Sequence, residues 1–375
     1  MREYEKREVE FLQAQDTHED YCGMPVLVKN SPTAEGPGWL DAHELAIMQN
    51  HWASRQETEE EKERKTAMSQ EESIQAMRDS MGFPNRNLCT EEIYTRFETI
   101  RAGENEVGLW RYYKRFSERK PGKPCLIFLH GGGWLGGTPY TVENPCRLIA
   151  QLADAVVFNV DYSLAPEKKF PNGFNDCYAA VRHVWEHAEE YGVDRTKIAV
   201  GGDSAGGNLS AAVCLRDRDM GTHMLALQVL IYPCVTMLYT GNPGYRFDLG
   251  EYTICEEQRS LIDPLISIAR PESEEDSRVQ MEGVYLPSRE AAYHPYVSPL
   301  LALSHRGLPR ALCVSAGFDG LRLQTEYYAG LLRRNGCEAR AIRYNGVSHA
   351  FLDKLGFLPQ AEDLCMEIAG ELRAL

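Results

Sequence analysis

Two glycine-rich stretches hold the residues of this sequence that are best suited to chemistry. Ser204 is the centre of a G-x-S-x-G motif that follows the apolar run Ile198–Val200. In such a motif a sharp turn from strand to helix lifts the serine hydroxyl out of the fold, and the glycines let the chain turn without clashes. The sequence at 130–134 is H-G-G-G-W, again after an apolar run. Its bare backbone can direct N–H groups at a developing oxyanion, so the two motifs together predict hydrolysis by acyl transfer.

A nucleophilic serine needs a base within hydrogen-bond reach and a carboxylate that orients the base. In folds that carry this serine turn, the partners follow the serine in the order Asp or Glu, then His. Of the ten histidines, His349 alone lies in a glycine-containing loop directly after a late apolar strand. His183 and His187 fall on an expected helix, away from any strand end. The position of His349 therefore favours it as the base.

Asp319 is the carboxylate whose position best fits the third role. It follows the apolar run Ala311–Ala316 and a short bend, so it lies at the carboxyl end of a strand, where open α/β sheets build their sites. Other carboxylates also lie between Ser204 and the histidine, in a polar stretch with no strand before them: Asp263, Glu274, Glu275 and Asp276. We interpret these as solvated charges.

Strands and helices must alternate to hold these residues in place. Apolar runs predict strands at 125–129, 155–160, 198–200, 226–232, 311–316 and 339–344. Helical patterns fall near 145–152, over 176–191, after Ser204, over 324–334 and from Pro359 onward. Such alternation predicts a mostly parallel sheet with helices on both faces. Alternating polarity from Ile93 to Phe116, around a turn at 103–105, predicts an antiparallel pair of strands.

Two segments depart from this alternation. Residues 1–90 are charge-rich, with a run of acidic and basic side chains over 56–65, and their apolar residues recur at helical spacing. We interpret them as a helical cap segment rather than a partly ordered extension, because apolar side chains there need burial: Trp39, Met48, Trp52 and Phe83. Residues 236–292 form a polar insertion that we interpret as a second cap or lid. The core is then divided into 91–235 and 293–375.

The composition narrows the class of protein. The 375 residues are 43% hydrophobic, enough for a large core, and the net charge of −15 argues against a nucleic-acid partner or an anionic membrane surface. We find no run of about 18 apolar residues and no signal peptide in the charged N-terminus. The 11 cysteines are scattered without a C-x-x-C pair, which indicates reduced thiols and a cytoplasmic protein. We expect a small-molecule ester as partner and leave a homodimer open.

No cofactor or metal is expected from the motifs. The sequence lacks H-E-x-x-H and any tight His/Cys cluster, and no G-K-[ST] follows the glycines at 131–133, so phosphate binding there is weakly supported. The acyl-transfer chemistry is complete without a Lewis acid. Asp161 and Glu167 could also suggest the paired carboxylates of a glycosidase, but such a pair must face an open cleft, and nothing else in the sequence supports one. We prefer to interpret these two residues as ones that hold the backbone of their loop in place.

On four ordered motifs the sequence resembles the hormone-sensitive-lipase-like family of α/β-hydrolase esterases. They are H-G-G-G-W at 130–134, D-Y-S-L-A-P-E at 161–167, G-D-S-A-G-G-N at 202–208 and Y-V-S-P-L-L at 296–301. The resemblance covers about residues 125–351 and implies the α/β-hydrolase fold with a helical cap. It implies Ser204 as nucleophile, His349 as general base and then acid, and Asp319 as its orienting partner.

The resemblance also implies roles for the neighbouring motif residues. The N–H groups of the oxyanion hole would be those of Gly132, Gly133 and Ala205, and the motifs would be supported by His130, Gly131 and Asp203. The family usually has Asp-Pro-Leu at the acid and His-Gly-Phe at the base, where this chain has D-G-L at 319–321 and H-A-F at 349–351. Neither change removes a functional group.

The sequence thus predicts a serine carboxylesterase that needs no cofactor and that hydrolyses short- to medium-chain acyl esters. The nearest alternative is the same chemistry with a dedicated substrate, either an acetylated sugar or a lactone. An alternative from another class is a non-catalytic small-molecule receptor on this fold. The presence of Ser204, Asp319 and His349 argues against the receptor, because such a protein has no use for a base.

Overall fold

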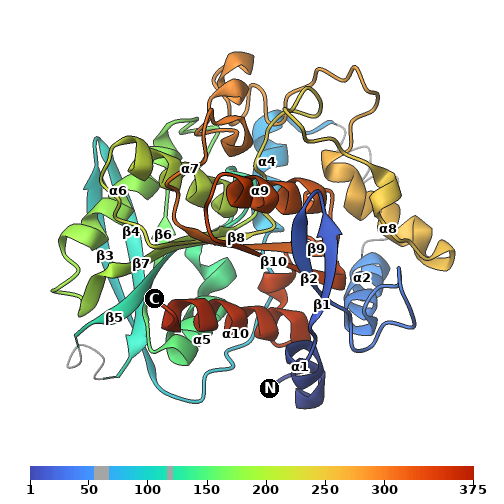
Figure 1. The fold of residues 1–375 in the computed structure, drawn as a ribbon, viewed down its shortest axis with the longest axis horizontal. Helices are drawn as coiled ribbons and strands as arrows, with labels where there is room; N and C mark the ends of the chain where they lie inside the picture. The colour runs from blue at the N-terminus through green and yellow to red at the C-terminus, as the bar shows by residue number, and fades with distance from the viewer. Residues whose placement is uncertain (55–66, 116–120) are drawn as a thin grey trace.

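The computed structural model describes residues 1–54, 67–115 and 121–375 of the chain. The charged run at 56–65 and Phe116, the expected end of the strand pair, lie outside the described residues. Within the described part, the chain forms one ten-stranded sheet in the order β1-β2-β10-β9-β8-β7-β5-β6-β4-β3 (Figure 1). Strands β2 and β5 to β10 run parallel, while β1, β3 and β4 at the two edges pair antiparallel.

The strands have the bounds β1 Thr17–Tyr21, β2 Met24–Lys29, β3 Ile93–Ala102, β4 Asn105–Lys114, β5 Lys123–Leu129, β6 Val156–Asp161, β7 Val193–Asp203, β8 Leu227–Ile231, β9 Arg310–Phe318 and β10 Ala339–Ser348. Each predicted strand is present. The central strands are continuous apolar runs because both of their faces are covered by helices.

The helices are α1 Lys6–Gln13, α2 Ala42–Ser54, α4 Gln70–Asp79, α5 Glu143–Ala153, α6 Asn172–Glu186, α7 Ala205–Asp219, α8 Arg259–Ile266, α9 Arg322–Arg334 and α10 Pro359–Arg373. Short 3₁₀ helices join them: η2 Pro139–Val142, η3 Leu249–Glu251, η4 Glu256–Gln258, η5 Ser267–Ala269, η6 Arg289–Tyr293, η7 Pro299–Leu301 and η8 Phe351–Lys354. No helix of the described part is long and apolar enough to cross a bilayer.

The helices cover both faces of the sheet. Figure 1 shows α5 and α10 together on one side, and α6, α7 and α9 on the other. Each side has its own apolar cluster: Ile149 and Ile368 belong to the first, and Val181, Leu209 and Leu323 to the second. The predicted fold class, a mostly parallel α/β sheet with helices on both faces, is confirmed.

The N-terminal segment differs from the expected helical cap at residues 17–29, where that interpretation is wrong. These residues form the hairpin β1–β2, and β2 extends the main sheet by pairing parallel with β10. The hairpin turn uses Cys22 and Gly23, both with positive φ (52° and 80°), as tight two-residue turns require. Its second strand, M-P-V-L-V-K, is almost wholly buried. This short apolar run was the signal for a strand.

The rest of the N-terminal segment packs against the core and against the insertion at 236–292. Cys255 N–H donates to Gly38 O over 2.9 Å, and Leu40 N–H donates to Gln258 Oε1 over 2.7 Å. Met48 is half-buried against the core. The Trp52 side chain, which we expected to be buried, lies outside the described residues. The two segments that we interpreted as caps are therefore in contact with each other.

Candidate active site

Ser204 lies on the sharp turn between β7 and α7. Its backbone has φ 54° and ψ −115°, a strained conformation for a residue with a side chain. The flanking glycines are required by contact with β5: a Cβ on Gly202 would lie 2.2 Å from Leu129 O, and one on Gly206 only 1.8 Å from the same atom. The turn is therefore built by close backbone packing, as the G-x-S-x-G motif predicts.

The three residues predicted to act together are hydrogen bonded in a chain. His349 Nε2 lies 2.8 Å from Ser204 Oγ, and His349 Nδ1 lies 2.6 Å from Asp319 Oδ2. They follow β7, β9 and β10, whose carboxyl ends meet at one edge of the sheet (Figure 1). The Asp319 side chain is fully buried, whereas the His349 ring is 24% exposed. Solvent and a small molecule can thus reach the histidine while the acid stays in a dry environment.

Asp319 is held from two sides. Its Oδ1 accepts a hydrogen bond from Leu321 N–H over 2.9 Å, so both carboxylate oxygens have partners. Tyr252 of the insertion donates from its hydroxyl to Asp319 O over 2.9 Å. The chain has glycine at 320, where the family usually has proline, and these bonds fix the loop without it.

The electrostatics of the site favour a charged His349. Burial lowers the pKa of the imidazole, but the charge of Asp319 and its hydrogen bond raise it, with a further contribution from Asp203. The net result is a pKa raised above its ordinary value of 6.5. An imidazole with a raised pKa accepts a proton more readily, which is what a base that acts on a hydroxyl needs.

Asp203 ties the glycine-rich loop at 130–137 to the serine turn. Its Oδ1 accepts a hydrogen bond from Gly131 N–H over 2.8 Å. A Cβ on Gly131 would lie 2.3 Å from Asp203 Oδ2, so only glycine allows this approach. Burial raises the pKa of Asp203 to about 6, although the bond from Gly131 opposes that shift. The residue immediately before the serine is thus a structural anchor for the loop.

Within the part of the chain that the structure describes, three backbone N–H groups near the serine turn donate to no protein acceptor. Among the described residues, neither Gly132 nor Gly133 N–H donates to a backbone or side-chain atom. Both glycines have positive φ, at 124° and 60°, which turns the loop sharply. Ala205 is the first residue of α7, where no intrahelical acceptor exists and the helix dipole favours negative charge. These donors suit an oxyanion.

His130 is part of the framework. Its Nδ1 donates to Gly131 O over 2.8 Å, and its ring stacks on Tyr162 with centroids 4.4 Å apart. Burial lowers the pKa of His130 to about 4, so the ring is neutral near pH 7. Tyr162 in turn donates from its hydroxyl to His130 O over 2.7 Å. The backbone before the glycines is therefore fixed by a stacked pair.

The carboxylates of the insertion have other partners. Asp276 is paired with Arg278 over 2.6 Å, Glu274 with Arg246 over 2.6 Å, and Asp263 with Arg259 over 3.6 Å. These are ion pairs within the insertion, and none of them involves His349. The structure thus brings Asp319, and not these carboxylates, to His349.

Sequence reasoning missed residues of the N-terminal segment that contact the site. Glu44 of α2 accepts hydrogen bonds from Ser348, which directly precedes His349. Arg78 of α4 donates to Leu135 O in the glycine-rich loop over 2.6 Å. Neither residue lies in a motif, and each contact joins positions far apart in the chain. Local pattern carries no signal for such contacts.

The fold and the serine turn together place this chain in the class of α/β-hydrolases. The profile of the α/β-hydrolase fold family matches residues 126–353, more than half of the chain. The chain belongs to the hormone-sensitive-lipase-like family of this fold, and it is a carboxylic ester hydrolase.

Relatives and solved structures agree with this assignment. The chain is 35% identical over 227 residues to an arylesterase of Saccharolobus solfataricus, a match that covers 60% of this chain and 68% of that protein. It is 38% identical over 246 residues to the carboxylic ester hydrolase LipN of Mycobacterium tuberculosis, a match that covers 61% of this chain and 57% of that protein. The hyperthermophilic esterase of Pyrobaculum calidifontis superposes with a TM-score of 0.70 at 30% identity, covering 90% of this chain and 98% of that one.

Proposed function

We propose that this carboxylic ester hydrolase cleaves short- to medium-chain acyl esters through a covalent acyl-enzyme on Ser204. The observation that carries the proposal is the continuous chain of hydrogen bonds from Asp319 through His349 to Ser204 Oγ. A serine hydroxyl is a weak nucleophile on its own, and an imidazole at hydrogen-bond distance takes its proton as it attacks.

In the acylation step, Ser204 Oγ forms a bond to the ester carbonyl carbon while its proton passes to His349 Nε2. The N–H groups of Gly132, Gly133 and Ala205 stabilise the negative charge that develops on the carbonyl oxygen. The imidazolium then gives its proton to the alcohol oxygen as the bond from that oxygen to the carbonyl carbon breaks. Asp319 stabilises the imidazolium and keeps the proton on Nδ1 throughout.

Deacylation repeats these steps with water as the nucleophile. His349 takes a proton from the water, whose oxygen bonds to the acyl carbon, and the same three N–H groups stabilise the second oxyanion. The imidazolium then returns a proton to Ser204 Oγ as the acid leaves. Every proton and electron pair is accounted for by these side chains and water, so the reaction needs no cofactor.

Contacts made by the insertion support a limited acyl pocket. Tyr285 of the insertion stacks on Trp134, the last residue of the H-G-G-G-W motif, with centroids 4.8 Å apart. Tyr252 of the insertion contacts the backbone of Asp319. A segment fixed to both the glycine-rich loop and the acid loop restricts the volume beside the serine, and restricted volume favours short chains.

The test is a panel of p-nitrophenyl esters of increasing acyl length with the wild type and with Ser204→Ala. We expect kcat/KM to be highest between acetyl and hexanoyl esters and kcat to fall roughly a millionfold in Ser204→Ala. A fluorophosphonate should add once, on Ser204. Full activity in Ser204→Ala, or an adduct elsewhere that abolishes activity, would contradict the mechanism.

Further substrates in the same panel separate the alternatives. Acetylated sugars and lactones test for a dedicated deacetylase or lactonase. Aryl acetates and aryl acetamides belong in the panel because two relatives are named arylesterase and, in Bos taurus, arylacetamide deacetylase. A kcat/KM for one of these far above that of simple esters would assign the natural substrate class. A wild type that binds ligands but turns over none would indicate a receptor.

A further inference from the structure

Arg78 of the N-terminal helix α4 contacts the glycine-rich loop from outside the catalytic core. We propose that Arg78 is a positioning residue, which fixes the backbone of that loop so that the Gly132 and Gly133 N–H groups meet the oxyanion. This inference rests on the proposed function, since it assigns a role in the same oxyanion hole. It gives the N-terminal segment a part in the rate of the reaction.

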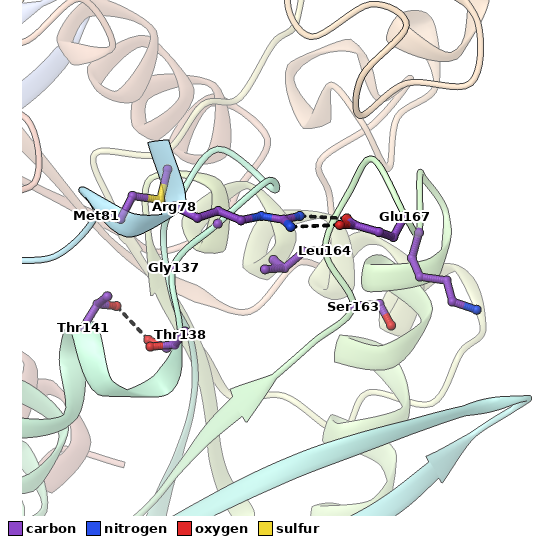
Figure 2. A pocket seen from close by; sticks show the side chains of 10 residues that line it. Arg78, Met81, Gly137, Thr138, Thr141, Ser163, Leu164 and Glu167 are labelled. Carbon is purple, nitrogen blue, oxygen red and sulfur yellow. Dashed lines mark hydrogen bonds and ion pairs between the residues drawn. The ribbon is translucent and has the colours of Figure 1, made fainter. Parts of the chain in front are cut away.

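The Arg78 guanidinium donates to four acceptor atoms, which belong to three residues in two loops. Its Nε donates to Leu135 O over 2.6 Å, and its Nη2 donates to Ala165 O over 2.9 Å. Its Nη1 and Nη2 also bind the two carboxylate oxygens of Glu167 at 2.8 and 2.7 Å. Figure 2 shows this side chain extended between the helix that carries it and the loop of Glu167. Only the planar fork of arginine can serve these acceptors at once.

The two loops joined by Arg78 are also bonded to each other. Ala165 N–H donates to Trp134 O over 2.9 Å. Arg78 therefore closes a ring of hydrogen bonds around residues 134–135, in which each loop supports the other. The residues after Leu135 line the pocket drawn in Figure 2, together with Leu164 and Glu167.

The glycine-rich loop is folded back on itself, so that a displacement of Leu135 is passed on to Gly132. Gly132 O accepts hydrogen bonds from Leu135 N–H over 3.1 Å and from Gly136 N–H over 3.0 Å. A Cβ on Gly132 would lie 2.1 Å from Gly136 O, so the turn leaves no free space. A shift of Leu135 must therefore move Gly132, whose own N–H is one of the proposed oxyanion donors.

The α4 helix also packs directly on the far end of this turn. A Cβ on Gly136 would lie 2.5 Å from Met81 Sδ and 3.1 Å from Arg78 Cγ. Glycine at 136 thus lets the helix end approach the loop backbone. The capping box at the start of α4, formed by Ser69 and Glu72, stabilises the helix that carries Arg78.

Exposure indicates which contact of Arg78 matters most. The Glu167 side chain is 62% exposed and Arg78 is 22% exposed, and exposed ion pairs contribute little to stability. The bonds from Arg78 to Leu135 O and Ala165 O are part-buried, and a carbonyl that loses its partner there is poorly compensated. We therefore expect the loss of Arg78 to affect catalysis more than the loss of the Glu167 charge.

The experiment compares Arg78→Ala, Arg78→Lys and Glu167→Gln with the wild type. Kinetics with p-nitrophenyl acetate give kcat and KM, and a trifluoromethyl ketone, which forms an oxyanion on the serine, gives an inhibition constant. In both Arg78 variants we expect kcat to fall roughly tenfold or more, below the loss of about 100- to 1000-fold caused by removing an oxyanion donor outright. KM should stay within about twofold of the wild type, because the contact acts in the transition state.

The inhibition constant is the readout that a purely structural role would not move. It should rise in the Arg78 variants by the same factor as kcat/KM falls, whereas Glu167→Gln should change both by less. Arg182→Lys is the matched control, since Arg182 forms an exposed pair with Glu186 over 3.6 Å on α6 and should change neither value.

The proposal is wrong if the Arg78 variants lose thermal stability but keep kcat and the inhibition constant, or if they raise KM alone. If Arg78→Ala fails to fold, Arg78→Lys tests the proposal alone: its inhibition constant should rise by the same factor as its kcat/KM falls. Failure of the proposed function has a different signature: the wild type would then lack ester hydrolysis, or Ser204→Ala would keep it. Stoichiometric labelling of Ser204 in the wild type by a fluorophosphonate shows that this serine is the nucleophile, and it thus separates the two cases.

Discussion

Glu44 and Ser348 form a hydrogen bond that joins the N-terminal helix α2 to the loop of His349. The Ser348 hydroxyl donates to Glu44 Oε1, and Ser348 N–H donates to the same atom over 3.3 Å. The Glu44 side chain is fully buried, and Lys354 Nζ lies 2.7 Å from both of its carboxylate oxygens. The residue next to His349, the proposed base, is therefore fixed by a buried ion pair that involves the N-terminal helix α2.

This arrangement predicts a large stability change on Glu44→Ala. The substitution leaves Lys354 without its partner in a buried place, and removing one member of a buried pair typically costs about 3–5 kcal/mol. We expect chemical denaturation to show a loss of at least about half that amount, because Lys354 keeps some contact with water. Replacing both residues by Met should restore part of the loss. An unchanged midpoint in Glu44→Ala would contradict this view of the pair.

The pH dependence of the reaction follows from the pKa of His349. The base must be neutral to accept the serine proton, so activity is lost as the pH falls through its pKa. Because that pKa is raised above 6.5, kcat/KM should rise with pH along a limb whose midpoint lies above 6.5. A midpoint well below that value would show that the Asp319 charge does not act on the imidazole as the structure indicates.

Substitution of the acid tests the same electrostatics in the opposite direction. Asp319→Asn removes the charge that raises the pKa of His349, while the burial that lowers it remains, so the limb should move to lower pH. The kcat should fall by about ten-thousandfold, since the amide favours the wrong imidazole tautomer. His349→Ala should be at least as severe. If Asp319→Asn keeps most of its activity, another group orients the base.

Chelation provides a check on the proposed chemistry. The mechanism uses a serine, an imidazole, a carboxylate, backbone N–H groups and water, so prolonged EDTA treatment should leave kcat within experimental error. Activity should be measured before and after dialysis, with a zinc metalloprotease treated in parallel as a positive control. A loss of activity that zinc alone reverses would reveal a metal requirement.

Deletion of residues 1–90 should abolish activity and solubility together. It removes β2, which pairs along the edge of β10 and carries the buried Val26 and Val28, and it removes Lys29, which pairs with the buried Asp363 over 2.5 Å. Apolar surface and an unpaired buried carboxylate would be exposed. A soluble, active 1–90 deletion with an unchanged chain-length profile would show the segment to be a mere extension.

The sequence predicts the parts of this protein that are encoded locally. The turn at Ser204 depends on glycines two residues away, and the strand before Asp319 is one continuous apolar run, so both are visible in a short window. The order of Ser204, Asp319 and His349 along the chain follows from the topology of the sheet. The structure places these three residues within hydrogen-bond distance of one another in the chain from Asp319 through His349 to Ser204.

The contacts that could not be predicted are those between distant segments. Arg78 and Glu44 lie in helices without a recognisable motif, and nothing in the neighbouring sequence shows that one reaches Leu135 O and the other Ser348. The strand β2 was missed for a related reason. A run of six residues within a charge-rich segment gives a weak signal, and its partner β10 lies at the other end of the chain.

The pairing of β2 with β10 constrains how the protein can be made in the cell. Asn30, which follows β2, and Asn345, which lies within β10, are hydrogen bonded although they are 315 residues apart. During synthesis the β2 hairpin leaves the ribosome early and must wait, with its apolar residues uncovered, until β10 emerges. Pairing over such a separation is slow, and exposed apolar strands aggregate. Chaperone demand should therefore be greatest for nascent chains that end before residue 339, and the loop of His349 should be among the last parts of the site to form.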